Sequence, residues 1–329
     1  MRFRLHFLQV RHPLLLVMTA LSVLAAVIAG LWLLLVPAES APSESAFSTQ
    51  PATPPVTSPP QTLPPASSGT PDTGWMRLAV TAEDLSRGTL ICVRAGLPFD
   101  ADAVESPVRL ADVKSSSYWL RSTELRVAEV MVSPLNRMLD DFAAESGLKT
   151  VNIVAAWRSA DEQRALYQQA LAQKGEQHAA AYLAIPSESE HHTGLAVDLA
   201  LYFPETGLSD DFTGSGAYAW IADNARRYGF VQRYPAEKAA VTGISGETWH
   251  YRYVGLPHSM LMADMDFCLE EYLDFLKAYP FDGEHLMVSC LGVSYELYVC
   301  TGEVFVPAND PAVLSGDNDS GFVVTVQRP

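Results

Sequence analysis

The sequence SESEHHTGLAVDL (residues 187–199) carries an acidic residue, Asp198, inside an apolar segment that has the composition of a buried strand. A bare carboxylate is costly to bury in such a strand. A salt bridge or a metal ion would each compensate for the charge, and His191, seven residues earlier, is available as a second metal ligand. The spacing alone leaves both interpretations open.

A second set of polar residues lies in ETWHYRYV (residues 247–254). On a strand His250 and Arg252 share one face, whereas Trp249 and the tyrosines share the other. Glu247 lies just ahead of this strand. A lone strand histidine is most often a core residue, but two histidines, an aspartate and a free glutamate together favour catalytic zinc. Such zinc takes three protein ligands and leaves a fourth position for water, from which a nearby carboxylate can take a proton.

A third motif, AAWRSADEQ (residues 155–163), places Arg158 directly before Ser159, the predicted N-cap of a helix. The positive potential of a helix N-terminus and an adjacent arginine together make an anion pocket. An arginine paired with a surface acid is an equally good explanation of this motif taken alone.

Together the three motifs resemble those of zinc D-Ala-D-Ala carboxypeptidases of the VanY type, over about residues 88–280. The family patterns S-x-H-x-x-G-x-A-x-D, E-x-W-H-x-R and Y-R-S are matched by Ser189-x-His191-x-x-Gly194-x-Ala196-x-Asp198, by Glu247-x-Trp249-His250-x-Arg252 and, more loosely, by Trp157-Arg158-Ser159. This resemblance implies the fold of the group that includes lysostaphin, D-Ala-D-Ala peptidases and sonic hedgehog. That fold is α+β, a small hedgehog/DD-peptidase-like sheet with flanking helices and the metal on one face.

The resemblance also implies the roles of the site residues. His191, Asp198 and His250 would bind one zinc ion per chain, with Glu247 as the general base. Arg158 would contact the substrate or the developing oxyanion. Four further residues would bind substrate or support the ligands, as Arg252 would by fixing ligand geometry: Ser189, Ser159, Trp249 and Arg252.

Three positions depart from the usual family pattern without replacing a ligand or the base: Trp157, His192 and Thr248, where tyrosine, glutamine and proline are common. Strict alternation back from Asp198 would put His192, not His191, on its face. We expect Gly194 to break this alternation, and the family pattern selects His191. His258 and His285 match no family position and are expected to be structural.

Composition excludes several other classes of protein. The 329 residues carry 22 Lys plus Arg against 38 Asp plus Glu, a net charge of −16, so nucleic acid is an unsuitable partner. Apolar residues make up 48%, which excludes wholesale disorder. Four cysteines without a C-x-x-C pair exclude a disulfide scaffold and a zinc-finger framework: Cys92, Cys268, Cys290 and Cys300.

The N-terminal region predicts a membrane anchor followed by a disordered stalk. Residues 1–12 contain three arginines and no acid, and residues 14–36 contain no charge. As a helix this run is about 34 Å long, enough to cross a bilayer core. We therefore expect a cytoplasmic segment (1–12), a transmembrane helix (13–36) and a Pro/Ser/Thr-rich linker (37–74). In a bacterium the catalytic domain would then face outward from the cell membrane; cleavage near 38–41 is the alternative.

The remaining chain is expected to form a zinc D,D-carboxypeptidase domain (75–280) and a C-terminal β extension (281–329). Its mixed pattern of elements, without a βαβ rhythm, indicates α+β. The predicted strands are 87–94, 151–157, 194–201, 249–254, 285–290, 294–300 and 321–327. The predicted helices are 133–147, 159–174, 216–227 and 259–279, the last burying Leu261, Met265, Cys268, Tyr272 and Leu276.

The predicted function is removal of the terminal D-Ala from peptidoglycan stem peptides that end in D-Ala-D-Ala. Two alternatives share the fold: another peptidoglycan peptidase (an endopeptidase or L,D-carboxypeptidase), or a non-catalytic wall-binding module. Retention of Glu247 with all three ligands weighs against a binding module.

Overall fold

A mixed sheet forms the centre of the peptidase region in the computed structural model, which describes residues 74–104 and 107–329. Its strand order is β3-β5-β6-β9-β8, and β7 pairs with the outer part of β6. The strands are β3 (Trp119–Leu120), β5 (Val151–Ala155), β6 (Ala196–Phe203), β7 (Leu208–Asp211), β8 (Phe230–Tyr234) and β9 (Glu247–Tyr253). All pairs are antiparallel except β3 with β5. The predicted combination of helices and strands is thus confirmed.

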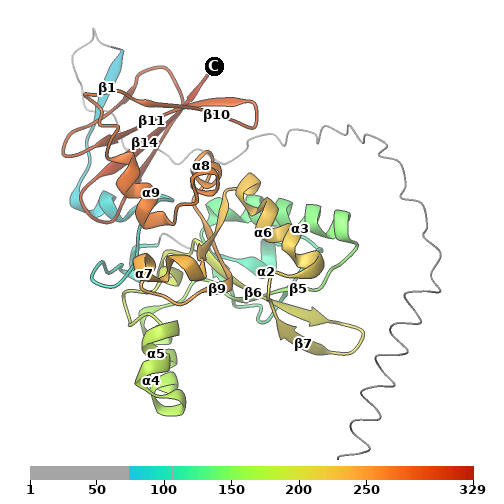
Figure 1. Cartoon of the computed structure of the whole chain (residues 1–329). Helices are drawn as coiled ribbons and strands as arrows, with labels where there is room; N and C mark the ends of the chain where they lie inside the picture. The colour runs from blue at the N-terminus through green and yellow to red at the C-terminus, as the bar shows by residue number, and fades with distance from the viewer. Residues whose placement is uncertain (1–73, 105–106) are drawn as a thin grey trace, which may run out of the picture. The chain divides into compact units, whose positions relative to one another are not determined.

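One face of this sheet is covered by α3 (Val132–Ser146) and α6 (Ala219–Asn224), which lie together in Figure 1. The apolar residues of α3 that recur at helical spacing are buried there with the apolar face of β6 and β9. The helix begins one residue earlier than predicted and ends at Gly147, whose φ of +72° suits glycine. The other helices are α2 (Leu110–Val113), α4 (Ala160–Lys174), α5 (Glu176–Tyr182), α7 (Ala239–Thr242), α8 (His258–Met265) and α9 (Leu269–Leu276).

The segment 87–94, predicted as a strand, pairs with none of the described strands. Its apolar residues are buried as expected, but its backbone groups bond to side chains and to isolated backbone partners such as Gly316 and Asp317. The N–H of Leu90 donates to Ser315 Oγ (2.9 Å), and the carbonyl of Ile91 accepts from Arg252 Nη2 (2.9 Å). The segment is therefore extended without belonging to a sheet.

The single helix predicted over 259–279 is instead two helices, α8 and α9. Asp266 has a φ of +53°, which ends α8. Cys268 and Glu271 then form a capping box that begins α9. As a result Met265 is 36% exposed rather than buried. The helix predicted over 216–227 is likewise interrupted: 3-10 turns lie on both sides of α6, and Gly229 ends the second of them.

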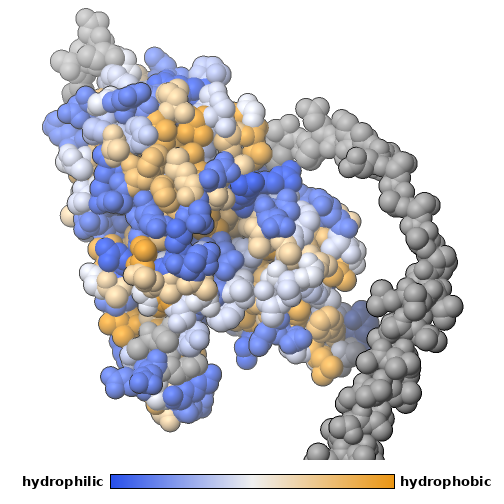
Figure 2. All heavy atoms as spheres, viewed as in Figure 1, coloured by the Kyte–Doolittle hydropathy of each residue, from blue (hydrophilic) through white to orange (hydrophobic). Residues whose placement is uncertain are grey.

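The C-terminal residues form a second sheet, of strand order β10-β11-β14-β13. Its strands are β10 (Leu286–Cys290), β11 (Val293–Cys300), β13 (Ala312–Gly316) and β14 (Phe322–Arg328). Beside it, β1 (Trp75–Leu78) pairs with β12 (Val304–Pro307), so the first described strand packs with the last part of the chain. An apolar patch lies over this part of the chain in the view of Figure 2.

Helices α4 and α5 pack on each other and project from the rest of the described chain (Figure 1). Only one side chain of α4, Gln163, is buried, and hydrophilic residues cover most of this projection in Figure 2. The predicted capping box of Ser159 and Glu162 is present, and Gly175 ends the helix.

The cytoplasmic segment, anchor and linker predicted over 1–12, 13–36 and 37–74 lie, apart from Gly74, outside the described residues. Among the residues that are described, no helix is sufficiently long and apolar to span a membrane.

The four cysteines are predicted to be free thiols, and in the structure all four are buried and unbridged. A hairpin centred on Gly292 is expected to pair Cys290 with about residue 295, whereas in the structure Cys290 pairs with Val293 across a turn at Leu291 and Gly292. Cys300 is then about 24 Å further along β11 at about 3.4 Å per residue, beyond the span of about 7 Å that a disulfide allows. Thiol titration of the unfolded, unreduced protein should find four groups; finding two would contradict this register.

Candidate active site

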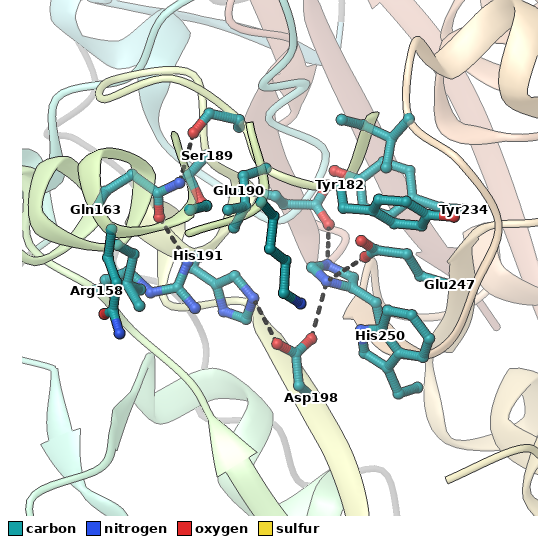
Figure 3. A pocket seen from close by; sticks show the side chains of 18 of the residues that line it. Arg158, Gln163, Tyr182, Ser189, Glu190, His191, Asp198, Tyr234, Glu247 and His250 are labelled. Atoms are coloured by element: carbon teal, nitrogen blue, oxygen red, sulfur yellow. Dashed lines mark hydrogen bonds and ion pairs between the residues drawn. The ribbon is translucent and has the colours of Figure 1, made fainter. Parts of the chain in front are cut away.

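Two adjacent strands and one turn bring the three predicted metal ligands together (Figure 3). Asp198 on β6 and His250 on β9 are direct partners across the antiparallel ladder. His191 lies in a 3-10 turn, η4 (Glu190–Thr193), directly before β6. One potential ligand atom from each of the three lies within 4.8 Å of the others.

The orientation of these side chains points their potential ligand atoms toward one another. His191 Nδ1 lies 2.8 Å from the Ala156 carbonyl, so Nδ1 donates and Nε2 faces Asp198 Oδ2 at 3.2 Å. His250 Nδ1 lies 3.0 Å from Asp198 Oδ1. Two imidazole nitrogens and a carboxylate oxygen are a donor set that suits zinc.

The structure brings His191, and not His192, to Asp198. His192 Nδ1 lies 2.7 Å from the Arg158 carbonyl, and its Nε2 accepts from the Ser187 N–H (3.2 Å). Gly194 ends the turn with a φ of +68°, and a Cβ there would lie 3.0 Å from the Ala128 nitrogen. This glycine therefore breaks the strand alternation as predicted.

Glu247 lies at the start of β9 with Oε2 3.5 Å from His250 Nδ1. Burial raises the pKa of its carboxyl to about 7; nearby His250 lowers it and nearby Asp198 raises it. A cation bound between the ligands would favour the carboxylate form. Glu247 thus lies beside the ligand atoms, and with a cation bound it would be the carboxylate that a general base requires.

Burial lowers the pKa of His250, but hydrogen bonds from its ring to Asp198 and Glu190 raise it to about 10. Without a cation the ring therefore carries a proton on both nitrogens. Metal binding at Nδ1 must displace one of them, because metal ligands bind in deprotonated form.

Arg158 lies beside the cluster, where its backbone N–H donates to the His191 carbonyl (3.2 Å). Its guanidinium donates to Gln163 Oε1 (2.5 Å), and Gln163 Nε2 donates to the Ala184 carbonyl (2.6 Å). Ser159, by contrast, uses its hydroxyl to cap α4 and does not line the pocket.

The cluster lies in a pocket of about 410 Å³ that extends along α4 and α5. Ser189 and Trp249 line it, as predicted, together with α4 residues such as Gln163 and Leu166. Two cationic side chains of the described residues line this pocket, Arg158 and Lys174.

Arg252 lies behind the pocket and is fully buried. It donates to Glu190 Oε1 (2.6 Å) and to the carbonyls of Thr89 and Ile91 (2.9 Å each). Its contact with the metal cluster therefore runs through Glu190, which in turn contacts His250.

Three charged residues of this network escaped the sequence analysis: Glu190, Arg233 and Glu270. Arg233, fully buried on β8, donates to Glu190 Oε1 (2.8 Å) and bidentately to Glu270 on α9 (2.6 and 2.8 Å). An arginine inside the apolar strand FVQRY was an available signal of a buried acidic partner.

His258 and His285 are structural, as expected, and neither lines the pocket. The ring of His258 lies between Tyr272 Oη (2.8 Å) and Thr325 Oγ1 (2.9 Å), and burial lowers its pKa to about 3. His285 contacts Glu296 and the Phe281 carbonyl.

Comparisons with known proteins agree with this geometry. A family model described as VanY, D-alanyl-D-alanine carboxypeptidase, matches residues 124–256. A D-alanyl-D-alanine carboxypeptidase of Enterococcus faecium is 32% identical over 254 residues, 75% of this chain and 78% of that protein. The bifunctional D-Ala-D-Ala dipeptidase and carboxypeptidase VanXYC of Enterococcus gallinarum is 39% identical over 130 residues, 39% of this chain and 68% of that protein.

A solved structure is also similar. It is the vancomycin resistance D,D-dipeptidase VanXYg in complex with a D-Ala-D-Ala phosphinate analog, with 32% identity and a TM-score of 0.69 over 77% of this chain and 99% of that one. The chain therefore belongs to the VanY family of D-alanyl-D-alanine carboxypeptidases and is a peptidase.

Proposed function

We propose that this protein is a zinc-dependent D-alanyl-D-alanine carboxypeptidase that removes the terminal D-Ala from peptidoglycan stem peptides. The observation that carries the proposal is the cluster of His191, Asp198 and His250 on the floor of a pocket, with Glu247 beside it. A binding module would have no use for three ligand side chains that converge in a pocket or for a glutamate held next to them.

His191 Nε2, His250 Nδ1 and an Asp198 oxygen would hold the ion. Bound there, zinc supplies a Lewis acid for the scissile carbonyl and an attacking water of lowered pKa. Glu247, which lies beside the ligand atoms, would hold the proton released by the attacking water and give it to the leaving amine. Arg158 and Ser189 line the same pocket, where they can bind the substrate or the oxygen that gains charge.

Mass spectrometry of a synthetic pentapeptide ending in D-Ala-D-Ala, incubated with the zinc-loaded full chain, tests the proposal. Loss of one alanine is expected, and Glu247→Gln is the matched inactive control. Release of D-Ala-D-Ala as a dipeptide, or cleavage at an internal bond, would show that the protein is a peptidase of another specificity and not a carboxypeptidase. If the peptide stays intact, the binding-module interpretation would be favoured.

A second candidate is a D,D-dipeptidase acting on free D-Ala-D-Ala. It is favoured by the similarity to VanXYg, 99% of whose chain is covered. Incubation of the free dipeptide in the same assay distinguishes the two activities: the carboxypeptidase proposal expects turnover of the pentapeptide to exceed that of the dipeptide. A preference for the dipeptide would favour the second candidate.

Arg158 is expected to hold the terminal carboxylate of the substrate. An arginine binds a carboxylate through two parallel hydrogen bonds, which lysine does not reproduce. Amidation of the terminal D-Ala should therefore lower kcat/KM by about 10–100-fold, the scale of one lost charged hydrogen bond. In Arg158→Lys the ratio of kcat/KM for the acid peptide to kcat/KM for the amide peptide should be smaller than in the wild type.

Steady-state kinetics on the acid and amide peptides separate this role from others. If Arg158 stabilises the oxyanion instead, Arg158→Lys loses turnover equally on both peptides. Lys174→Met is the control, because Lys174 is the other cation that lines the pocket among the described residues. If the acid-to-amide ratio of kcat/KM falls in Lys174→Met and not in Arg158→Lys, Lys174 would be the residue that binds the terminal carboxylate.

We also propose that residues 13–36 anchor the chain in the cell membrane with the peptidase outside the cytoplasm. The support is the uncharged run that follows three arginines. Protease added to intact spheroplasts should digest the peptidase and spare a cytoplasmic marker. Protection of both would contradict the proposed orientation.

A further inference from the structure

Glu190 lies directly behind the metal cluster, and its side chain is fully buried. Its Oε2 lies 3.0 Å from His250 Nε2, the ring nitrogen that faces away from Asp198. Figure 3 shows Glu190 on the opposite side of the His250 ring from Asp198. The His250 ring is therefore held between two carboxylates.

The other oxygen of Glu190 has two guanidinium donors. Oε1 accepts from Arg252 Nη1 (2.6 Å) and from Arg233 Nε (2.8 Å), and both arginine side chains are buried. With these donors on Oε1, Oε2 is left as the acceptor for the His250 ring. Because a carboxylate only accepts hydrogen bonds, Nε2 must carry the proton.

We propose that Glu190 is a positioning residue, which keeps the proton of His250 on Nε2 and thereby presents the Nδ1 lone pair to the metal site. This inference rests on the proposed function, since it concerns how a ligand of the proposed zinc ion is oriented. A neutral imidazole has one protonated nitrogen and one lone pair, so the partner of one nitrogen determines the role of the other. Hydrogen-bonded carboxylates behind ligating histidines fix ring and tautomer in this way.

Stability alone does not account for this arrangement. Buried ion pairs are often no more stabilising than apolar residues of similar volume, because the desolvation of the charges offsets their attraction. Here the buried network also spans three elements: Glu190 on η4, Arg233 on β8 and Glu270 on α9. Within this network, Glu190 is the carboxylate that contacts His250, whereas Glu270 contacts Arg233.

The variant Glu190→Gln tests the proposal sharply. The two arginines on the Oε1 side select the amide oxygen, which turns the NH2 group of glutamine toward His250 Nε2. Nε2 would then have to accept, and the proton would move to Nδ1, where it competes with zinc. We expect the zinc affinity, measured by competition with a chelator, to fall about 10–100-fold.

Two further variants separate positioning from loss of a buried charge. Glu270→Gln removes the bidentate partner of Arg233 without touching His250, and its zinc affinity should change less than threefold. Glu190→Gln with Arg252→Met keeps the net charge of the cluster and should still bind zinc weakly, even if Glu190→Gln alone fails to fold. Thermal unfolding of the metal-free proteins shows which variants are folded.

Nitrogen-15 NMR of the histidine rings supplies a readout that a structural role would not move. In the zinc-loaded wild type, His250 should show a protonated Nε2 and a zinc-bound Nδ1, and the folded Glu190 variant should lose this pattern. Unchanged zinc affinity in the Glu190 variants, or an equal loss in Glu270→Gln, would overturn the inference. Zinc binding without release of D-Ala would instead contradict the proposed function.

Discussion

Replacement of Glu247 by glutamine is expected to lower turnover of a D-Ala-D-Ala peptide by about 10²–10⁴-fold, the usual contribution of a general base. The amide keeps the shape of the side chain and cannot take a proton from water. Because Glu247 lies beside the ligand atoms without completing the cluster, the zinc content should stay near one ion per chain. Turnover and elemental analysis of the same preparation measure both quantities.

Glu237→Gln is the matched control, since it removes an exposed carboxylate that does not line the pocket. Its turnover should equal that of the wild type. Loss of zinc from Glu247→Gln would make Glu247 a ligand rather than the base. Undiminished turnover in that variant would remove it from the reaction.

Single alanine substitutions at the three ligands should abolish both zinc binding and activity. Removing His191, Asp198 or His250 leaves two protein ligands where a catalytic zinc site requires three. Elemental analysis should find less than a tenth of the wild-type zinc, and turnover should fall below detection at equal protein concentration. Added zinc should restore activity to a chelated wild type and not to these variants.

His192→Ala provides the control within the same turn, because the His192 ring points to the Arg158 carbonyl and the Ser187 N–H. This variant should keep its zinc. If it lost zinc while His191→Ala kept it, the register of the whole turn would be wrong.

The parts of the site that lie on strands could be predicted from the sequence. Asp198 and His250 stand out because each interrupts an apolar strand, and strand alternation places each on a definite face. His191 could not be placed in the same way. It lies in a 3-10 turn, whose geometry has no strand period, and only the family pattern distinguished it from His192.

The parts that depend on distant partners could not be predicted. Glu190 is a glutamate in a turn, and nothing local separates it from a solvated one. Its burial follows from Arg233 and Arg252, far along the chain. For the same reason the strand predicted over 87–94 is wrong: the segment is apolar, but its backbone bonds to partners far along the chain, such as Ser315 and Arg252, and not to a neighbouring strand.

The pairing of β1 with β12 has a consequence for the order in which the protein is made. Trp75 pairs with Pro307, and roughly 230 residues of synthesis separate them, about 10–50 s at rates of about 5–20 residues per second. During this time β6 and β9 emerge and can complete the sheet that carries the ligands. Strand β1, by contrast, has no β12 to pair with until the end of synthesis is near. The strands that carry the metal ligands can thus fold before the N-terminal strand Trp75–Leu78 has its partner. Until β12 is synthesised, Trp75–Leu78 is the segment that a chaperone would have to shield.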